Sequence, residues 1–552
     1  MRTNLHLSLT ILLVASVLET LHAATADTQR FCVRDFGADG SHYKRNTLAF
    51  QRAIDECSKR GGGVVEVPKG TYELGRVHLK ANVTLRLATG AILTPTKNLE
   101  AFPALRGDPR SFFRRESGES STTCRYSLLY AYRANNLTIE GSGKIVGDGK
   151  AFWDRRNTGD FPKWKTWAPA FYYKARKGRP FLIMLEQCEN VRIRDITLED
   201  APVYGALFAG CRGMQLQNVT VRNDLAGPNT DGFHFSSCRD VRITGCDFTC
   251  GDDCIAIDGN YMGLSSNFTI SECHFSTTVN AFRIFTGLSH FLPKERPRER
   301  VSDICASNCT VRDASGVFNI VADGGDIERL SFSNFTVNME QRGCALFLLT
   351  LRGGRIQNII FNHMAIRTDG IGTISGEGGG RIRNVLLDGL LYEAVPRTKL
   401  YGNGLPEPIP AYSAAHYAPY NLFVRHAQNL KLRNLTVEWQ QGDLADLHQV
   451  PHATNTWSCI QCRNVQGLDI EGVVCAQFGT ASPAILLEDV QDARITQCRA
   501  MEGTGVFLRL KGRSKNIRFL DNDLTKAATP YQTDNPSSIA PSHSRDGISQ
   551  ER

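Results

Sequence analysis

A short phrase, in which an Asn is followed by alternating apolar and β-branched residues, recurs along most of the chain. It reads NVTL from Asn82, NLTI from Asn136, NVTV from Asn218, NFTI from Asn267, NCTV from Asn308, NFTV from Asn334 and NLTV from Asn434. The Asn suits a tight turn, and the alternation after it is typical of a short strand with one buried face. Short strands that recur at about 20 to 30 residues, with few helical segments between them, indicate a solenoid.

The fold that satisfies this repeat is an all-β, right-handed parallel β-helix. Each coil pairs its strands with the same strands of the next coil, so neighbouring rungs lie about 4.8 Å apart. Each coil also covers the apolar face of its neighbour, so stability grows with the number of coils. Every phrase doubles as an Asn-x-Thr glycosylation acceptor, but we interpret the recurrence first as a turn followed by a strand.

One N-terminal segment predicts a helix that caps this solenoid. In NTLAFQRAIDECSKRGGG, the apolar residues Phe50, Ala53, Ile54 and Cys57 follow the spacing of an amphipathic helix. The glycines at 61–63 end it. Because the open end of a solenoid needs a cover, we expect a short capping helix there.

The first 26 residues are typical of a signal peptide. Arg2 supplies a positive charge, residues 5–18 are apolar, and Ala24-Thr25-Ala26 offers a cleavage site. The alternative is a buried N-terminal helix. No later window approaches 18 apolar residues, so we expect a soluble protein, secreted or periplasmic, without a membrane partner.

The remaining chain predicts one catalytic domain. We assign residues 27–525 to the β-helix, with a loop insertion at about 98–180 that is rich in aromatic residues, Arg and Gly. Residues 526–552 are polar and rich in Ser and Pro, and we expect a disordered tail. The sequence leaves the oligomeric state open.

Composition excludes few functions but disfavours two. A net charge of +8 on 552 residues is small, and no Lys/Arg run with interleaved aromatics indicates nucleic-acid binding. Among the 17 cysteines, Cys459 and Cys462 form one C-x-x-C without a partner pair, so we expect no metal site. Cysteines in strand-like runs are explained equally well by buried interior positions and by disulfides: Cys188, Cys211, Cys238, Cys273 and Cys305.

Three carboxylates predict a site. CGDDCIAIDG places Asp252 and Asp253 side by side before an apolar strand, although repulsion and desolvation both cost free energy. Asp231 precedes Asp252 by 21 residues, about one coil, so the three can lie on neighbouring rungs. Crowding raises at least one carboxyl pKa, which lets a protonated acid and an ionised base coexist, as a glycosidase needs. The alternative is a ladder of hydrogen-bonded aspartates at coil corners.

These motifs resemble glycoside hydrolase family 28, the polygalacturonases and their relatives. NTDGF followed by GDDC fits that family, and DFGADGSHYKRNTLAFQRAIDEC, GSGKIVGDGKAFWD and RPFLIMLEQCENVRIRDITLEDAP are similar to its N-terminal half. The resemblance runs from about Phe31 to about Asp326, and more loosely to the end. It implies an extracellular β-helix enzyme that hydrolyses a pectin-like polysaccharide or oligosaccharide with inversion and without a metal or other cofactor.

The resemblance also implies roles for individual residues. Asp252 matches the general acid, Asp231 and Asp253 match the carboxylates that activate water, and Asn229 matches the Asn that orients the site. His234, three residues after Asp231, either contacts substrate or lies outward on the surface. Asp258 and Tyr261, beyond the second motif, are weaker candidates.

Two departures from the family pattern weaken the case for galacturonic acid. Where the family has Gly-His-Gly, TTVNAFRIFTG places Asn280, while His274 lacks the flanking glycines. Where the family holds the sugar carboxylate with Arg-Ile-Lys, SGVFNIVADGG places Asn319 and Val321. Arg283 is a candidate for that carboxylate, or else part of a structural ion pair.

Three functions follow from this pattern. The first is an inverting glycoside hydrolase, polygalacturonase-like but with altered substrate-binding residues. The second is a polysaccharide lyase on the same fold, with Arg283 as base and calcium held by aspartates. The third is a non-catalytic carbohydrate-binding β-helix. The sugar, the linkage and the choice between exo and endo action are open.

Overall fold

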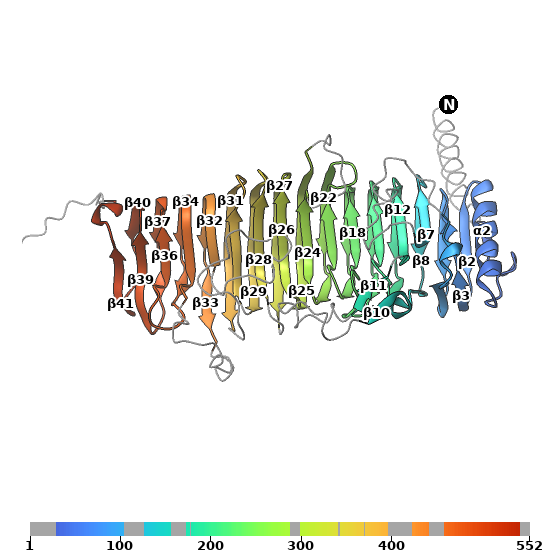
Figure 1. Ribbon diagram of the computed structural model, residues 1–552, viewed down its shortest axis with the longest axis horizontal. Coiled ribbons are helices and arrows are strands. Elements are labelled where there is room, and N and C mark those ends of the chain that lie inside the picture. The colour runs from blue at the N-terminus through green and yellow to red at the C-terminus, as the bar shows by residue number, and fades with distance from the viewer. Residues whose placement is uncertain are drawn as a thin grey trace, which may run out of the picture.

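The protein is a long right-handed parallel β-helix, as the repeat predicts. In the computed structural model the coils follow one another along the long axis from the N-terminus to the C-terminus (Figure 1). The described residues are 29–103, 126–155, 173–176, 178–287, 298–339, 343–368, 370–395, 422–440 and 457–540. Strands make up about 61% of the structure and helices 6%, which places it in the all-β class.

Strands in corresponding positions of successive coils pair in parallel and form three ladders. The first ladder, which carries the site, is β4 (Val77–His78), β7 (Ser127–Tyr132), β12 (Phe181–Glu186), β15 (Ala206–Ala209), β18 (Phe233–Ser236), β21 (Ile255–Asp258), β24 (Asn280–Thr286), β26 (Gly316–Asp323), β28 (Cys344–Leu351), β30 (Gly370–Gly376), β32 (Leu422–Arg433), β34 (Ile460–Glu471), β36 (Ile485–Glu488), β39 (Thr504–Lys511) and β41 (Ala527–Thr533).

The other two ladders complete the coil. The second is β1 (Arg30–Cys32), β2 (Gly63–Val67), β5 (Val83–Leu87), β8 (Leu137–Glu140), β13 (Glu189–Arg194), β16 (Arg212–Gln217), β19 (Arg239–Thr244), β22 (Leu264–Ser271), β37 (Gln491–Thr496) and β40 (Lys515–Leu520), with parts of β32 and β34. The third is β3 (Gly70–Leu74), β6 (Ala91–Pro95), β9 (Lys144–Val146), β14 (Thr197–Glu199), β17 (Thr220–Arg222), β20 (Asp247–Cys250), β23 (His274–Thr277), β33 (Thr436–Trp439), β35 (Val474–Cys475) and β38 (Arg499–Ala500). Long strands run through both: β25 (Arg300–Asp313), β27 (Asp326–Asn338), β29 (Arg355–Thr368) and β31 (Arg381–Ala394).

The interior of the coils is built from alternate residues of each strand. In β18, Phe233 and Phe235 belong to the buried core, so His234 between them points to the outer face. The rings of Phe208 and Phe235, in register on neighbouring rungs, stack at 5.0 Å between centroids. Such stacks of aromatic residues fix the register of the ladder that carries the outer residues.

The recurring Asn residues occupy the turns that the sequence predicts. All seven have a positive φ, from 50° at Asn434 to 61° at Asn82 and Asn267, a conformation that Asn adopts more readily than most residues. Their side chains also bond from rung to rung, since Asn136 donates to Asn82 across 2.8 Å and accepts from Asn190 across 2.7 Å. The phrase is therefore a turn and an amide ladder.

The predicted capping helix is confirmed as α2 (Tyr43–Lys59), which lies at the N-terminal end of the stack (Figure 1). Its buried face contains Phe50, Ala53, Ile54 and Cys57. The His42 side chain accepts a hydrogen bond from the backbone of Lys44 at the start of the helix. Among the described helices, none is long and apolar enough to cross a membrane.

The predicted loop insertion at 98–180 is wrong in its extent. Strands β7, β8 and β9 lie within it and form a complete rung between the coils before and after. The largely buried segments SLLYAY of β7 and LTIE of β8 make them coil strands despite the aromatic-rich segments around them. The remaining described parts include the antiparallel pair β10 (Trp153–Arg155) and β11 (Tyr173–Ala175) and the short 3-10 turns η1 (Leu99–Ala101) and η3 (Gly149–Phe152). Residues 104–125 and 156–172 lie outside the described residues.

The predicted boundary of a disordered tail at 526 is also wrong. Strand β41 pairs with β39, and a 3-10 turn η8 (Pro536–Ser538) follows it. The polar composition of this segment led to the wrong prediction of disorder. The last rung exposes one face to solvent, so it needs no apolar residues there. The signal peptide assigned to residues 1–26 and the end of the tail, 541–552, lie outside the described residues.

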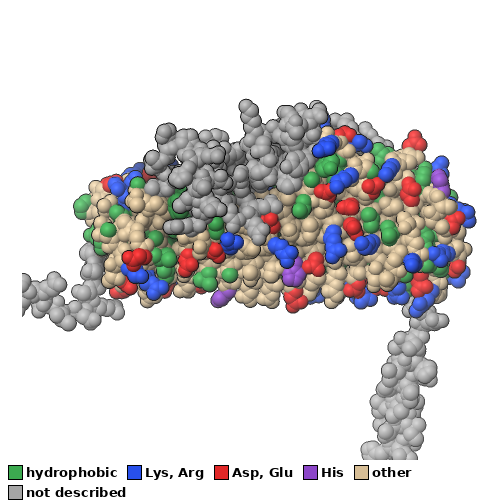
Figure 2. Space-filling view, turned by 90° about the horizontal axis from the view of Figure 1, so that it is seen from below, with side chains coloured by type: hydrophobic (Ala, Val, Ile, Leu, Met, Phe, Trp, Pro, Cys, Tyr) green, Lys and Arg blue, Asp and Glu red, His purple; other side chains and the backbone are tan. Residues whose placement is uncertain are grey.

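The described cysteines do not form disulfides with one another. Cys188, Cys211, Cys238 and Cys273 are buried inside the coils, as one of the two interpretations predicts, whereas Cys305 is exposed. On the face seen in Figure 2, basic and acidic side chains are interleaved along the described surface, in keeping with the small net charge.

Candidate active site

The three predicted carboxylates lie at the start of two neighbouring rungs. Strands β18 and β21 pair with Phe233 opposite Ile255, and the backbone N–H of Gly232 donates to the carbonyl of Asp253 across 2.9 Å. This register sets Asp231, two residues before β18, level with Asp253. Asp252 lies one residue further from β21, so the third carboxylate is offset along the strand direction.

The three carboxyl groups affect one another's ionisation. Burial and the neighbouring negative charges of Asp231 and Asp253 raise the pKa of Asp252 well above its usual value. Burial and the charge of Asp231 raise the pKa of Asp253 to about 6, although Arg283 and Asn280 oppose the rise. Burial also raises the pKa of Asp231, against the opposing effect of His234. Burial and crowding therefore make each of the three carboxyls harder to ionise than a free one.

Asn280, on the next rung, forms a hydrogen bond with the carboxylate cluster. Its Nδ2 donates to Oδ1 of Asp253 across 2.6 Å, and its Oδ1 accepts from Nδ2 of Asn319 across 3.2 Å. Nη1 of Arg283 donates in turn to Oδ1 of Asn319. The two departures from the family pattern, Asn280 and Asn319, are thus connected to Arg283 by one hydrogen-bond chain.

Arg283 lies on the same outer row of the ladder as His234. His234 pairs in register with Ala256, and Ala256 with Arg283, so the two side chains are two rungs apart, about 10 Å. The Arg283 guanidinium lies over the ring of Phe285 at 5.3 Å, and the residue as a whole is 8% exposed. Its positive charge lowers the pKa values of Asp252 and Asp253, which places it beside the carboxylate cluster.

Asn229 and His234 contact protein groups in this structure. Oδ1 of Asn229 accepts from Nη2 of the buried Arg179 across 3.1 Å. His234 is neither a free surface residue nor a fully buried one, since its side chain is 13% exposed and bound to Asp231 and Asp258. The weaker candidate Asp258 is therefore part of the cluster, and Tyr261 bonds instead to the buried Glu186 across 2.7 Å.

Sequence reasoning missed two residues near these carboxylates. Arg179 bonds Asn229 and also lowers the pKa of Asp231, and Tyr204 stacks on the ring of His234 at 4.9 Å. Both belong to earlier coils than Asp231. Arg179 begins the family-like stretch RPFLIMLEQCENVRIRDITLEDAP, but that stretch does not indicate a contact with Asn229 or Asp231, and Tyr204 lies outside it. Only knowledge of the register between coils would identify them.

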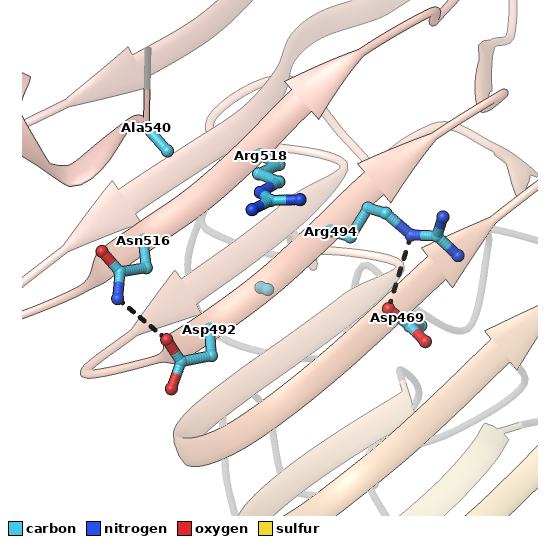
Figure 3. Close-up of a pocket in the computed structure, with 7 residues that line it drawn as sticks. Asp469, Asp492, Arg494, Asn516, Arg518 and Ala540 are labelled. Carbon is cyan, nitrogen blue, oxygen red and sulfur yellow. Dashed lines mark hydrogen bonds and ion pairs between the residues drawn. The ribbon is translucent and has the colours of Figure 1, made fainter. Parts of the chain in front are cut away.

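A separate hollow near the C-terminal end has a different chemistry. It has a volume of about 560 Å³ and lies over strands β34, β37 and β40 (Figure 3). Its acidic groups are paired, because Asp469 lies 3.6 Å from Arg494 and Asp492 accepts from Asn516 across 2.9 Å. It lacks the crowded carboxylates of the Asp231 cluster, which is the better candidate for acid–base chemistry. Among the described residues, no group of three His, Cys, Asp or Glu is arranged to hold a metal ion.

The sequence profile of glycosyl hydrolases family 28 matches residues 57–339, about half of the chain and the whole carboxylate cluster. The chain belongs to glycosyl hydrolases family 28. A probable polygalacturonase of Vitis vinifera is 31% identical over 232 residues, which cover 41% of this chain and 44% of that protein. A probable polygalacturonase of Arabidopsis thaliana is 25% identical over 320 residues, covering 55% and 62%. The chain thus matches less than two thirds of the length of either relative.

A solved structure agrees with the fold of this family 28 chain. The exopolygalacturonase of Thermotoga maritima superposes with a TM-score of 0.50, over 74% of this chain and 91% of that one, at 18% sequence identity. At this identity the likeness concerns the β-helix alone. The family resemblance drawn from NTDGF and GDDC is confirmed by the family match.

Proposed function

We propose that the protein is an exported glycoside hydrolase that cleaves a pectin-like or related polysaccharide with inversion. The observation that carries this proposal is the meeting of Asp231, Asp252 and Asp253 from two neighbouring coils, with all three pKa values raised. Family membership supports hydrolysis of glycosidic bonds. Export rests on the composition of residues 1–26.

In this mechanism Asp252 is the general acid. Its pKa is raised well above the usual value, so it keeps a proton that it donates to the leaving glycosidic oxygen. Asp231 and Asp253 act as the base that takes a proton from water on the opposite face of the sugar. In an inverting enzyme the acid and the base are about 6.5–9.5 Å apart. Carboxylates on neighbouring rungs that are also offset along the strand direction are compatible with such a separation.

The rate is expected to follow a bell-shaped pH profile. The raised pKa values of Asp231 and Asp253, the latter about 6, support a rise of activity around that pH as this pair of carboxyls ionises. The fall at higher pH follows the deprotonation of Asp252, whose raised pKa keeps the acid limb and the basic limb apart.

We further propose that Arg283 recognises a carboxylate on the sugar. It faces outward on the row of His234, beside the carboxylate cluster, and Asn319 holds one of its guanidinium nitrogens. A guanidinium and a sugar carboxylate form a charge-assisted contact, which favours an acidic sugar such as a uronate. Asn319 lies opposite Arg283 and Val321 opposite Phe285, where the family pattern has Arg and Lys, so this recognition depends on Arg283.

The test is a panel of acidic and neutral polysaccharides and aryl glycosides, with the products identified and their anomeric configuration followed by proton NMR. We expect saturated products of inverted configuration with the wild type, and loss of activity with an unchanged circular dichroism spectrum in Asp252→Asn. An unsaturated, ultraviolet-absorbing product would indicate a lyase. Binding of a polysaccharide without any cleavage would indicate a non-catalytic carbohydrate-binding protein.

A further inference from the structure

His234 lies between two carboxylates that come from different coils. Its Nδ1 is 3.4 Å from Oδ2 of Asp231, and its Nε2 is 2.7 Å from Oδ2 of Asp258. An imidazole offers a donor at both nitrogens only when it is protonated. Two carboxylate partners therefore favour the imidazolium form of His234.

Asp258 is fixed from its other side. Its Oδ1 accepts from Oγ of Ser236 across 2.6 Å and from the backbone N–H of Asn260 across 2.7 Å. The residue is 1% exposed. These donors orient the carboxylate so that Oδ2 meets His234, and Asp258 has little freedom to turn toward a bound sugar.

Two aromatic rings fix the plane of the imidazole. Tyr204, from the preceding coil, stacks on His234 at 4.9 Å and 12° between the ring planes. Phe285 meets it edge-on at 6.0 Å and 90°. The ring is thus held in the orientation that presents Nδ1 to Asp231, and contact with Tyr204 also suits a cationic ring.

We propose that His234 is a positioning residue: anchored by Asp258, its imidazolium keeps Asp231 ionised and oriented as the carboxylate that takes the proton from water. This inference rests on the proposed function and divides the role of base unequally between Asp231 and Asp253. Asp253, held by Asn280 and level with Asp231, then orients the water and keeps Asp252 protonated through its charge.

The surrounding charges are consistent with this division. Asp258 and the phenol of Tyr204 contact His234. Asp252, Asp253 and Arg179 interact electrostatically with Asp231, and Arg283 interacts with Asp252 and Asp253. Burial lowers the pKa of His234, but the hydrogen bonds and charges of Asp231 and Asp258 outweigh it and raise the pKa to about 10. In turn His234 lowers the pKa of Asp231 against the effect of burial.

The first test is the pH dependence of kcat/KM for His234→Gln, with His274→Gln as the matched control. His274 is an exposed histidine that bonds Thr310 on the outside of the coil. Because loss of a cation within about 4 Å raises a carboxyl pKa by about 1–3, we expect the acid limb to move to higher pH by about one unit or more. Activity should recover as the pH rises, and His274→Gln should keep the wild-type profile.

Asp258→Asn provides a second variant with the same expected direction, because it weakens the anchor without touching Asp231. A higher KM with an unmoved acid limb in His234→Gln would overturn the proposal, since that result describes a substrate contact. An equal loss of kcat at every pH would overturn it as well, because recovery at high pH is the signature of a displaced base.

The second test does not need activity. Carbon-13 labelling at the Cε1 position of the 13 histidines, with the signal of His234 identified by its absence in His234→Gln, reports its protonation directly. We expect His234 to stay protonated through pH 8, and a midpoint near 6.5 would overturn the proposal. A wild-type protein that cleaves no polysaccharide would instead refute the proposed function. The titration would still decide whether His234 is held as an imidazolium between Asp231 and Asp258.

Discussion

Replacement of Asp253 by Asn should make the protein more stable at pH 8 and not at pH 4. In the folded state the pKa of Asp253 is raised from 3.8 to about 6, so ionisation is harder in the folded than in the unfolded chain. Stability is therefore lost as pH rises through about 4 to 6 and stays lower above that range. A rise of this size corresponds to about 3 kcal/mol at about 1.4 kcal/mol per pKa unit.

The amide at position 253 removes this cost but keeps an oxygen that accepts the hydrogen bond of Asn280. It also relieves the repulsion that raises the pKa of Asp252. We expect a gain of about 2–3 kcal/mol at pH 8. Since a chain of 552 residues unfolds with an entropy of about 1 kcal/mol per kelvin, the melting temperature should rise by about 2–3 °C.

The assay is thermal unfolding by scanning calorimetry at pH 4 and pH 8. The matched control is Asp240→Asn. Hydrogen bonds from Asn267 and Arg212 lower the pKa of Asp240, so the ionised carboxylate of Asp240 stabilises the folded state, whereas that of Asp253 destabilises it. The control should show no gain at either pH. A melting temperature of Asp253→Asn that is unchanged, or that falls equally at both pH values, would refute the crowding of these carboxylates.

Substitutions at three further positions test the substrate contact, the turns and the core. Arg283→Gln should raise KM for acidic oligosaccharides by about 10–100-fold, the value of a hydrogen bond to a charged group, and leave the KM for neutral substrates unchanged, as initial rates will show. Asn136→Ala should cost about 1–2 kcal/mol in urea unfolding through its lost ladder bonds and its φ of 56°, and Asn136→Gly, which tolerates that φ, should cost less. Phe318→Ala should cost about 3–5 kcal/mol in the same assay, because the ring is fully buried, and a cost below 1 kcal/mol would contradict the aromatic interior.

Much of the fold could be predicted because its signals are local. A turn Asn such as Asn136 and the alternation after it lie within four residues, and the α2 pattern lies within one helix. The carboxylates were predictable for a related reason, since Asp231 and Asp252 are separated by one coil and the parallel ladder converts that separation into proximity.

The parts that could not be predicted depend on long-range register or on solvent exposure. Tyr204 and Arg179 reach the site from earlier coils, and no motif marks the pairing of His234 with Asp258. Strand β41 escaped prediction because an end rung with one solvated face has the polar composition of a tail. Strands β7 to β9 were obscured by the aromatic-rich segments on either side.

The central claim is that acidic groups from neighbouring coils flank one glycosidic bond. The most direct measurement is a crystal structure of Asp252→Asn with an uncleaved oligosaccharide bound. We expect the carboxamide at position 252 about 3 Å from the bridging oxygen, with Asp231 and Asp253 on the opposite face of the sugar and a water between. An oligosaccharide bound on another part of the solenoid, or with all three side chains on the same face of the bond, would contradict the account.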